Sequence, residues 1–477
     1  MRIMGQLLLN EIKFGTDGWR GVISDNFTYK NVSIVTQAIC DWIKNDYKLK
    51  SGQEKKVAVG YDARFLSKEY AEIVSSVLAA NNIKVYLSEI MIPTPALSYG
   101  VVYIKAVCGI MITASHNPAQ FNGIKIKTDQ GGGASREVTD RVEKYLGKTL
   151  VQSIDFHEAT LKKRIVIHDF KKAYLAFMRK YLDFNRIKTS RFKVIQDVMH
   201  GSGCRILEEV LKDSRVSVEL MRAEVNPSFG GVKPEPIAEY LPELLVRMKR
   251  EKFDLGLVLD GDADRIAAVA PGGEFISPQK ILGLLVLHLV RNRGRSGGVV
   301  KTTCGTTMID HIAKKLGLKL YETPVGFKYI SDLMISERIV AGGEEAGGMG
   351  VQDYIPERDG TLAGLLLLEM MVYEKKNIKQ LLNEMEKEFG RYYYERADLS
   401  LRGRIFNIDK VRQVKRLLGK RVIGIKDFDG VKLICEDESW LMLRPSGTEP
   451  LVRAYSEAKS LDHAKALIKV GLKLLKP

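Results

Sequence analysis

Strand-length apolar runs alternate with helical patterns three times along this chain. Each round begins with a buried strand, continues into an amphipathic helix and closes with a second strand. The paired strands are Val57–Tyr61 and Ile83–Leu87, Phe192–Asp197 and Val216–Leu220, and Gly298–Thr303 and Leu318–Glu322. Strands that alternate with helices form sheets covered by helices, so the pattern predicts three α/β domains in series. Ser67 is predicted to cap the first of these helices.

The last stretch of the chain follows a different pattern. A helix carrying Val411, Val414 and Leu418 is predicted to end at Gly419, short strands follow, and a final helix begins at Ser460. This order indicates a smaller α+β domain, which brings the 477 residues to four domains. The predicted domains are residues 1–155, 156–268, 269–388 and 389–477.

Composition and apolar patterning exclude several classes of protein. The longest apolar runs, Ile281–Leu287 and Leu365–Leu368, are shorter than the roughly 18 residues that a membrane span needs. Leu7–Leu9 is interrupted too early to form the core of a secretion signal. The five cysteines form no CxxC pair, which is typical of a reducing compartment and excludes a thiolate zinc knuckle. We therefore expect a cytoplasmic protein with no membrane partner.

Four polar loops follow predicted strands, one in each domain. They are Thr113–Pro118, Asp260–Arg265, Gly342–Gly348 and Arg444–Pro450. In open α/β sheets, ligands collect outside the carboxyl ends of the strands. We therefore expect the loops to face one central cleft.

The second loop has the composition of a metal site. Asp260, Asp262 and Asp264 alternate after an apolar strand, and each close carboxylate pair would repel by about 4 kcal/mol at an effective dielectric near 20. A bound cation removes that cost, and hard oxygen ligands favour Mg²⁺. An EF-hand is rejected because Arg265 and Pro271 stand where its glycine and glutamate belong. An aspartate-rich surface turn is the alternative.

The first and fourth loops suit phosphate chemistry. Ser115 lies outside any G-x-S-x-G pattern, so a hydrolase nucleophile is unsupported, but a nearby metal and cations would let it accept a phosphoryl group. Arg444–Thr448 combines a guanidinium, two hydroxyls and a glycine, which suits a phosphate dianion. The alternatives are an ordinary turn serine and an exposed strand-to-turn connection.

Together the motifs resemble the α-D-phosphohexomutase superfamily, the phosphoglucomutase and phosphomannomutase enzymes. The resemblance spans nearly the whole chain and rests on Phe14–Gly21, Thr113–Pro118, Asn122–Lys125, Asp260–Arg265, Gly343–Gly347 and Arg444–Pro450. It implies three related α/β/α domains with mixed sheets plus a smaller, mobile C-terminal α+β domain, in a heart shape around a central cleft. It also implies a Mg²⁺-dependent enzyme that interconverts the 1- and 6-phosphates of glucose or mannose through a phosphoserine and a hexose 1,6-bisphosphate.

The resemblance assigns roles around the reacting phosphate. Ser115 resembles the phosphoserine, whose oxygen would complete a single Mg²⁺ site per chain with Asp260, Asp262 and Asp264. Arg20 and Arg265 resemble the arginines beside the reacting phosphate, and Lys125 and His116 resemble the groups that transfer protons. The residues that resemble the grip on the non-reacting phosphate are Arg444, Ser446, Gly447, Thr448 and Arg453.

The sugar loop departs from the common family pattern. Glu344 and Lys328 resemble residues that face the sugar, but Ala346 replaces the usual serine and Gly348 stands where many bacterial members carry histidine. These departures leave open the substrate preference and the second proton-transfer group. A phosphoglucosamine mutase is the alternative within the family.

Two rival functions come from other classes. A haloacid-dehalogenase-like phosphatase would use Asp260 as the nucleophile, because Asp260 and Asp262 match its D-x-D motif, but it leaves Ser115 and Arg444 unexplained. A non-catalytic binder of nucleic acid or phosphosugars is suggested by the net charge of +16. No concentrated basic run supports nucleic-acid binding. The expected partner is a small sugar phosphate, with no nucleic acid, bound by a monomer or homodimer.

Overall fold

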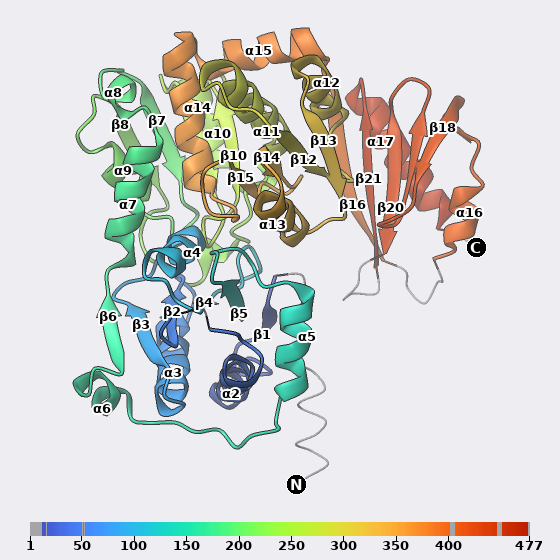
Figure 1. The fold of residues 1–477 in the computed structure, drawn as a ribbon. Coiled ribbons are helices and arrows are strands. Elements are labelled where there is room, and N and C mark those ends of the chain that lie inside the picture. Colours follow the sequence, from blue (N-terminus) through green and yellow to red (C-terminus); the bar gives the residue numbers. More distant parts are fainter. Residues whose placement is uncertain are drawn as a thin grey trace.

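Four β-sheets organise this computed structural model, which describes residues 12–15, 17–49, 51, 53–400, 406–445 and 451–475 (Figure 1). Three sheets are mixed and carry helices, and the fourth is antiparallel. The predicted three α/β/α domains and C-terminal α+β domain are confirmed. Leu7–Leu9 lies outside the described residues. Within the described part of the chain, no helix combines the length and apolar character needed to cross a membrane.

The first sheet has the strand order β1-β5-β4-β2-β3-β6. Its strands are β1 (Trp19–Val22), β2 (Lys56–Tyr61), β3 (Lys84–Ser88), β4 (Cys108–Ile112), β5 (Phe121–Thr128) and β6 (Ile165–His168). Its helices are α2 (Tyr29–Asn45), α3 (Ser67–Ala80), α4 (Thr94–Tyr103), α5 (Arg136–Tyr145) and α6 (Phe156–Leu161). Although β6 lies past the predicted boundary at residue 155, it pairs with β3 in this sheet.

The start of α3 differs from its prediction. Ser67 is the first helical residue, and the capping position before it is Leu66, whose φ of 60° is left-handed. The Ser67 hydroxyl donates instead to the Asp62 carboxylate at 2.8 Å. Ser67 therefore anchors the end of β2 and is not a helix cap.

The second sheet has the order β11-β10-β9-β7-β8. Its strands are β7 (Lys193–Asp197), β8 (Ser217–Met221), β9 (Leu255–Leu259), β10 (Ile266–Ala270) and β11 (Glu274–Ile276). The helices are α7 (Phe170–Tyr181), α8 (Phe184–Ile187), α9 (Ile206–Leu211) and α10 (Pro242–Arg250), with 3₁₀ turns η1 (Phe229–Gly231) and η2 (Ala238–Tyr240). The predicted boundary at residue 268 falls inside β10, and the boundaries stay predictions.

The third sheet has the order β13-β12-β14-β15. Its strands are β12 (Gly298–Thr302), β13 (Lys319–Thr323), β14 (Ile339–Gly343) and β15 (Met349–Val351). The helices are α11 (Pro278–Leu287), the π-helical η3 (His288–Asn292), α12 (Thr307–Leu316), α13 (Phe327–Ser336), α14 (Gly360–Glu374) and α15 (Ile378–Phe389).

The fourth sheet runs β16-β21-β20-β19-β18-β17 and packs against α17. Its elements are β16 (Tyr393–Ser400), α16 (Ile408–Arg412), β17 (Arg416–Leu417), β18 (Lys420–Lys426), β19 (Val431–Cys435), β20 (Trp440–Pro445), β21 (Leu451–Ala458) and α17 (Leu461–Leu474).

The predicted helix reaching Leu418 is wrong. The helix α16 ends at Arg412, and Leu418 and Gly419, both with positive φ, form the two-residue turn between β17 and β18. Two left-handed residues match the twist of a tight hairpin, which explains why the turn displaces the helix. The final helix begins as predicted, with Ser460 as its cap.

The first three sheets share one arrangement that positions the polar loops. In each, the parallel strands, four in the first sheet and three in the second and third, are followed by an antiparallel neighbour. A short connection leads to this neighbour, from β4 to β5, from β9 to β10 and from β14 to β15. The connection carries Ser115 in the first domain, the aspartates in the second and Glu344 in the third. Related hairpins therefore supply three of the predicted site loops.

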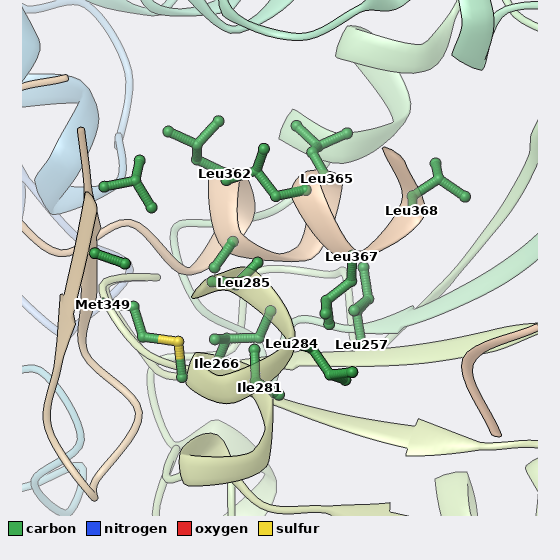
Figure 2. Close-up of a cluster of buried hydrophobic side chains, with 14 of the residues drawn as sticks. Leu257, Ile266, Ile281, Leu284, Leu285, Met349, Leu362, Leu365, Leu367 and Leu368 are labelled. Carbon is green, nitrogen blue, oxygen red and sulfur yellow. The ribbon is translucent and has the colours of Figure 1, made fainter. Parts of the chain in front are cut away.

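A continuous apolar core joins the second and third domains. The helix α14 is buried along most of its length and packs with α11 over β9 and β10 (Figure 2). Leu362 and Leu365 of α14, Leu284 of α11, and Leu257 and Ile266 of the second sheet belong to this cluster. The fourth domain has its own cluster, formed between its sheet and α17. The loops of the second and third domains thus stand on a shared, closely packed base.

Candidate active site

The hairpin loops of the first and second domains meet at Ser115. The Ser115 hydroxyl donates to Asp260 Oδ2 at 2.9 Å, and both residues are buried. The backbones approach closely here, because a Cβ on Gly261 would lie 2.6 Å from the Ser115 carbonyl oxygen. The predicted neighbourhood of the serine and the aspartates is therefore present in the structure.

The Ser115 loop is held in an uncommon backbone conformation. Ser115 has a φ of 53°, a left-handed value that a non-glycine residue adopts only when its surroundings enforce it. The buried Arg64 guanidinium supplies that support. Its Nη2 donates to the carbonyls of Ser115 and Asn117 at 2.6 Å, and its Nη1 donates to those of Pro118 and Phe121 at 2.9 Å. Arg64 thus fixes the loop through four backbone oxygens.

Asp62 completes this support from the end of β2. Its Oδ2 accepts from the Thr113 hydroxyl at 2.6 Å, and that hydroxyl accepts from the Ser115 N–H at 2.9 Å. Burial raises the pKa of Asp62, against the opposing effect of Arg64, whose Nε lies 3.2 Å away. Sequence reasoning missed both residues. The signal was available, because a charged pair follows directly after the buried strand.

The three aspartates form a compact acidic cluster. One carboxylate oxygen from each lies within 4.8 Å of the others. Burial and the charges of Asp262 and Asp264 raise the pKa of Asp260 well above its usual value. Burial opposes ionisation of Asp262 as well, but Lys125 and the Thr94 hydroxyl outweigh it and hold that pKa low. Lys125 Nζ lies 2.9 Å from Oδ2 of both Asp262 and Asp264.

Two oxygens of this cluster remain available to a cation. Within the described ranges, the buried Oδ1 atoms of Asp262 and Asp264 make no hydrogen bond. Unsatisfied buried carboxylate oxygens are costly, and oxygen-only donors are the ligands that Mg²⁺ prefers. The donor set therefore fits a divalent cation.

Asp17 connects the N-terminal motif Phe14–Gly21 to the aspartate cluster. Its Oδ2 lies 2.8 Å from Lys125 Nζ, 2.7 Å from Arg358 Nη2 and 3.8 Å from Arg20 Nη2. Burial would raise the pKa of Asp17, but the charges of Arg358 and Lys125 hold it well below its usual value. Arg20 also donates to the Asn117 side chain at 2.6 Å. Arg20 is thereby positioned beside the Ser115 loop.

Arg358 is a central residue of the site that sequence reasoning missed. Its Nη2 lies 2.7 Å from Asp264 Oδ2, and its Nη1 donates to Glu344 Oε2 at 3.2 Å. A Cβ on Gly348 would lie only 2.1 Å from Arg358 Cδ. The Arg358 side chain therefore occupies space that a histidine at position 348 would need. Its sequence signal was the charged run Glu357–Asp359 before the apolar helix α14.

His116 and Arg265 border the serine. The distance from His116 Nδ1 to Ser115 Oγ is 3.4 Å. Burial and the neighbouring charges of Arg265 and Arg20 hold the pKa of His116 well below its usual value. The Arg265 N–H donates to Asp260 Oδ1 at 3.1 Å. The site thus places a neutral imidazole next to the serine hydroxyl.

The residues assigned to the distant phosphate lie on other elements. Arg444 on β20 stands directly opposite Arg453 on β21, and Arg444 Nε donates to Asp429 Oδ1 at 2.7 Å. Lys328 lies at the start of α13, with its Nζ 5.0 Å from the centre of the Tyr329 ring. Ser446, Gly447 and Thr448 lie outside the described residues. The roles of all these residues stay predictions.

Four segments of the chain match known domains in sequence order. Residues 11–151, 172–273 and 277–389 match phosphoglucomutase/phosphomannomutase alpha/beta/alpha domains I, II and III. Residues 401–469 match the C-terminal domain of the same enzymes. The chain belongs to the phosphoglucomutase/phosphomannomutase family.

Two relatives and one solved structure are similar to this chain over nearly its full length. A phosphoglucomutase/phosphomannomutase from Thermococcus kodakarensis is 31% identical, with 97% of this chain and 98% of the relative covered. A probable phosphoglucosamine mutase from Methanosphaera stadtmanae is 30% identical, with 97% and 98% covered. A solved structure from Thermus thermophilus, assigned as a phosphomannomutase, has a TM-score of 0.86 and 32% identity, with 98% of this chain and 99% of that chain covered.

Family membership decides between the enzyme classes considered from the sequence. The chain is an isomerase-class phosphotransferase of the phosphoglucomutase/phosphomannomutase kind. The matches favour this class over a haloacid-dehalogenase-like phosphatase and over a non-catalytic binder. The resemblance inferred from the loop motifs is confirmed.

Proposed function

We propose that this enzyme interconverts hexose 1-phosphate and hexose 6-phosphate, with Ser115 as a reloadable phosphoryl carrier. The observation that carries the proposal is the 2.9 Å contact between Ser115 Oγ and Asp260 inside a buried cluster of cationic side chains. An ordinary turn serine would not require support from Arg64 at four backbone carbonyls.

Each transfer exchanges one oxygen–phosphorus bond for another. The bond between Ser115 Oγ and phosphorus breaks, and a bond forms between phosphorus and the free hydroxyl of the sugar phosphate. The sugar hydroxyl gives up its proton, and Oγ regains one when the hydroxyl is restored. We assign proton exchange at Oγ to His116, because its Nδ1 lies 3.4 Å away. The hexose 1,6-bisphosphate then turns round and returns its other phosphoryl group to Ser115.

Positive charge around the serine offsets two phosphates. A phosphoserine carries about −1.5 to −2 charges near neutral pH, and the substrate brings a second phosphate group. Arg20, Arg265 and Lys125 lie around the serine and the aspartates. One Mg²⁺ per chain, held by Asp260, Asp262, Asp264 and a phosphoserine oxygen, would add charge neutralisation there. The protein's own cations would position the reacting group and offset its charge.

The substrates we propose are the phosphates of glucose, mannose or both, with glucosamine phosphate as the alternative. Glu344 is fixed by Arg358 and would meet the sugar hydroxyls. The alternative is favoured by the similarity to the Methanosphaera stadtmanae protein, and Ala346 leaves the preference of the sugar loop open. Lys328 would add a cation on the third domain.

The fourth domain would provide the grip on the non-reacting phosphate and a cover for the cleft. Across a central cleft, the non-reacting phosphate would be gripped by Arg444, Ser446, Gly447, Thr448 and Arg453. The fourth domain would close over the cleft and exclude water, which protects the phosphoserine from hydrolysis. We propose a cytoplasmic monomer or homodimer that binds small sugar phosphates and no nucleic acid.

The test is coupled turnover of glucose 1-phosphate, mannose 1-phosphate and glucosamine 1-phosphate by the wild type and by Ser115→Ala. We expect turnover of glucose or mannose 1-phosphate by the wild type and a fall of at least about 10⁴-fold in the variant, as for loss of other enzymatic nucleophiles. Equal activity of the two proteins would reject Ser115 as the carrier. Exclusive use of glucosamine 1-phosphate would reject the proposed specificity.

A further inference from the structure

One carboxylate of the fourth domain bridges two segments assigned to ligand binding. Asp429 Oδ1 accepts from Arg444 Nε at 2.7 Å, and its Oδ2 accepts from the backbone N–H of Val325 at 2.7 Å. Arg444 belongs to the phosphate grip, and Val325 belongs to the third-domain segment 324–328 that ends in Lys328. Both oxygens of Asp429 are therefore committed, one to each domain.

The turn that carries Asp429 is built for this close approach. Gly430 has a φ of 87°, and a Cβ there would lie 2.6 Å from the Leu443 carbonyl oxygen and 2.9 Å from Arg444 Cα. Only glycine combines that conformation with that contact. The Asp429–Gly430 turn therefore packs directly against the backbone of Arg444.

Three other contacts between described residues of the third and fourth domains lack this double connection. Lys432 Nζ donates to the Thr303 carbonyl at 2.7 Å, Lys426 pairs with Glu322 at 2.8 Å, and Glu457 accepts from the Thr307 N–H at 2.8 Å. These contacts join the domains without touching Arg444. Asp429 differs because it contacts Arg444 while holding the third-domain segment.

We infer that Asp429 is a positioning residue that orients Arg444 for the non-reacting phosphate and couples this grip to the segment carrying Lys328. The inference deepens the proposed function and rests on it. An arginine held at Nε keeps its plane and direction, so less freedom is lost when a phosphate binds. The same carboxylate also holds the backbone of Val325. Binding of the phosphate therefore also fixes the segment 324–328 of the third domain against the fourth domain.

The decisive variant is Asp429→Asn in the full-length protein. An amide keeps the size of the side chain but has one accepting oxygen, so it cannot serve Arg444 and Val325 together. We expect KM for glucose 1-phosphate to rise about tenfold, because a charge-assisted hydrogen bond is lost, with kcat changed less than about twofold. The Kd of glucose 6-phosphate, measured by calorimetry, should rise by the same factor.

The matched control is Asp427→Asn. Asp427 lies two residues earlier, is exposed, and pairs with Arg412 of the same domain at 3.0 Å. We expect its KM and Kd to stay within about twofold of wild type, since exposed pairs contribute little. Equal effects of the two variants would overturn the inference, because general loss of negative charge would then explain both.

A double-mutant cycle separates positioning from a merely structural role. In an Arg444→Ala background, Asp429→Asn should change KM and Kd less than about twofold, because the residue it orients is already gone. A full tenfold effect in that background would overturn the inference. If the wild type binds glucose 6-phosphate without turnover, the proposed function fails, while the Kd measurements still decide the role of Asp429. Failure to bind any of these sugar phosphates would overturn both.

Discussion

The proposed reacting end of the site and the proposed phosphate-gripping end are built on different principles. Ser115 and the three aspartates are at most 1% exposed and stand on hairpin loops of two domains that meet at the serine. Arg444 and Arg453 lie on adjacent strands of one antiparallel sheet, with side chains 16% and 28% exposed. The fourth domain has a separate core. One end is therefore fixed from several sides, and the other is carried by a single smaller body.

The electrostatics differ in the same way. At the reacting end Arg358 approaches Asp17, Asp264 and Glu344, and Lys125 approaches Asp17, Asp262 and Asp264. Removing one member of such a buried network leaves uncompensated charge, which typically costs about 3–5 kcal/mol. At the gripping end, partly exposed charges interact more weakly because solvent screens them. This contrast supports the proposed roles, a preorganised centre for bond exchange and an adjustable grip for a bisphosphate that turns round.

The largest effect that would sharpen the comparison is expected from Arg64→Ala. The change removes four hydrogen bonds to the Ser115 loop and leaves the buried Asp62 carboxylate without its cationic partner. We expect the free energy of unfolding to fall by about 3–5 kcal/mol. Urea unfolding measures this loss, and a parallel assay should show reduced kcat in the folded fraction.

An exposed arginine of the same domain provides the control. Arg136 pairs with Asp140 at 3.6 Å and its side chain is 80% exposed. Arg136→Ala should change the unfolding free energy by less than about 0.5 kcal/mol. Similar losses in the two variants would show that the Ser115 loop depends on overall charge and not on the Arg64 contacts.

A second test concerns the space shared by Gly348 and Arg358. Gly348→Ala introduces a Cβ where Arg358 Cδ already lies, 2.1 Å away, so the arginine must move. We expect a loss of about 1–3 kcal/mol in unfolding free energy, typical of overpacking. In an Arg358→Ala background the same substitution should cost less, which urea unfolding of the four proteins would show. Equal costs in both backgrounds would contradict the assignment of this space to Arg358.

The smallest effect is expected at the gripping end. Arg444→Ala removes one partly exposed cation from the proposed phosphate grip, so KM for glucose 1-phosphate should rise about tenfold, equivalent to about 1.4 kcal/mol. The unfolding free energy should change by less than about 1 kcal/mol. Steady-state kinetics and urea unfolding check the two values. A large loss of stability with unchanged KM would reverse the contrast between the two ends.

The sequence predicted the architecture and the meeting of Ser115 with the aspartates because both follow from local rules. Apolar periodicity marks the strands, and polar loops gather at strand ends. Charged runs beside a strand and a helix marked Arg64 and Arg358, but the partners that give these residues their roles lie far away in the chain. Arg358 reaches Asp17 across 341 positions, and no local pattern encodes that contact.

Local errors had local physical causes. Ser67 is a residue type that often caps helices, but its hydroxyl donates a hydrogen bond to Asp62. The residue before the helix is Leu66, whose backbone is in the left-handed conformation. Leu418 continues an apolar helical pattern, but it forms a hairpin turn with Gly419 because Arg416 and Leu417 pair with β18. In both cases another contact within a few residues overrides the preference for a helix or a helix cap.

The most direct test of the account is to identify the residue that carries phosphate. The full-length protein would be incubated with Mg²⁺ and glucose 1,6-bisphosphate, digested and analysed by peptide mass spectrometry, with Ser115→Ala treated in parallel. We expect one acid-stable phosphate on Ser115, removed by glucose 6-phosphate and missing from the variant. Phosphate on Asp260, or on no residue while the enzyme turns over, would contradict the account.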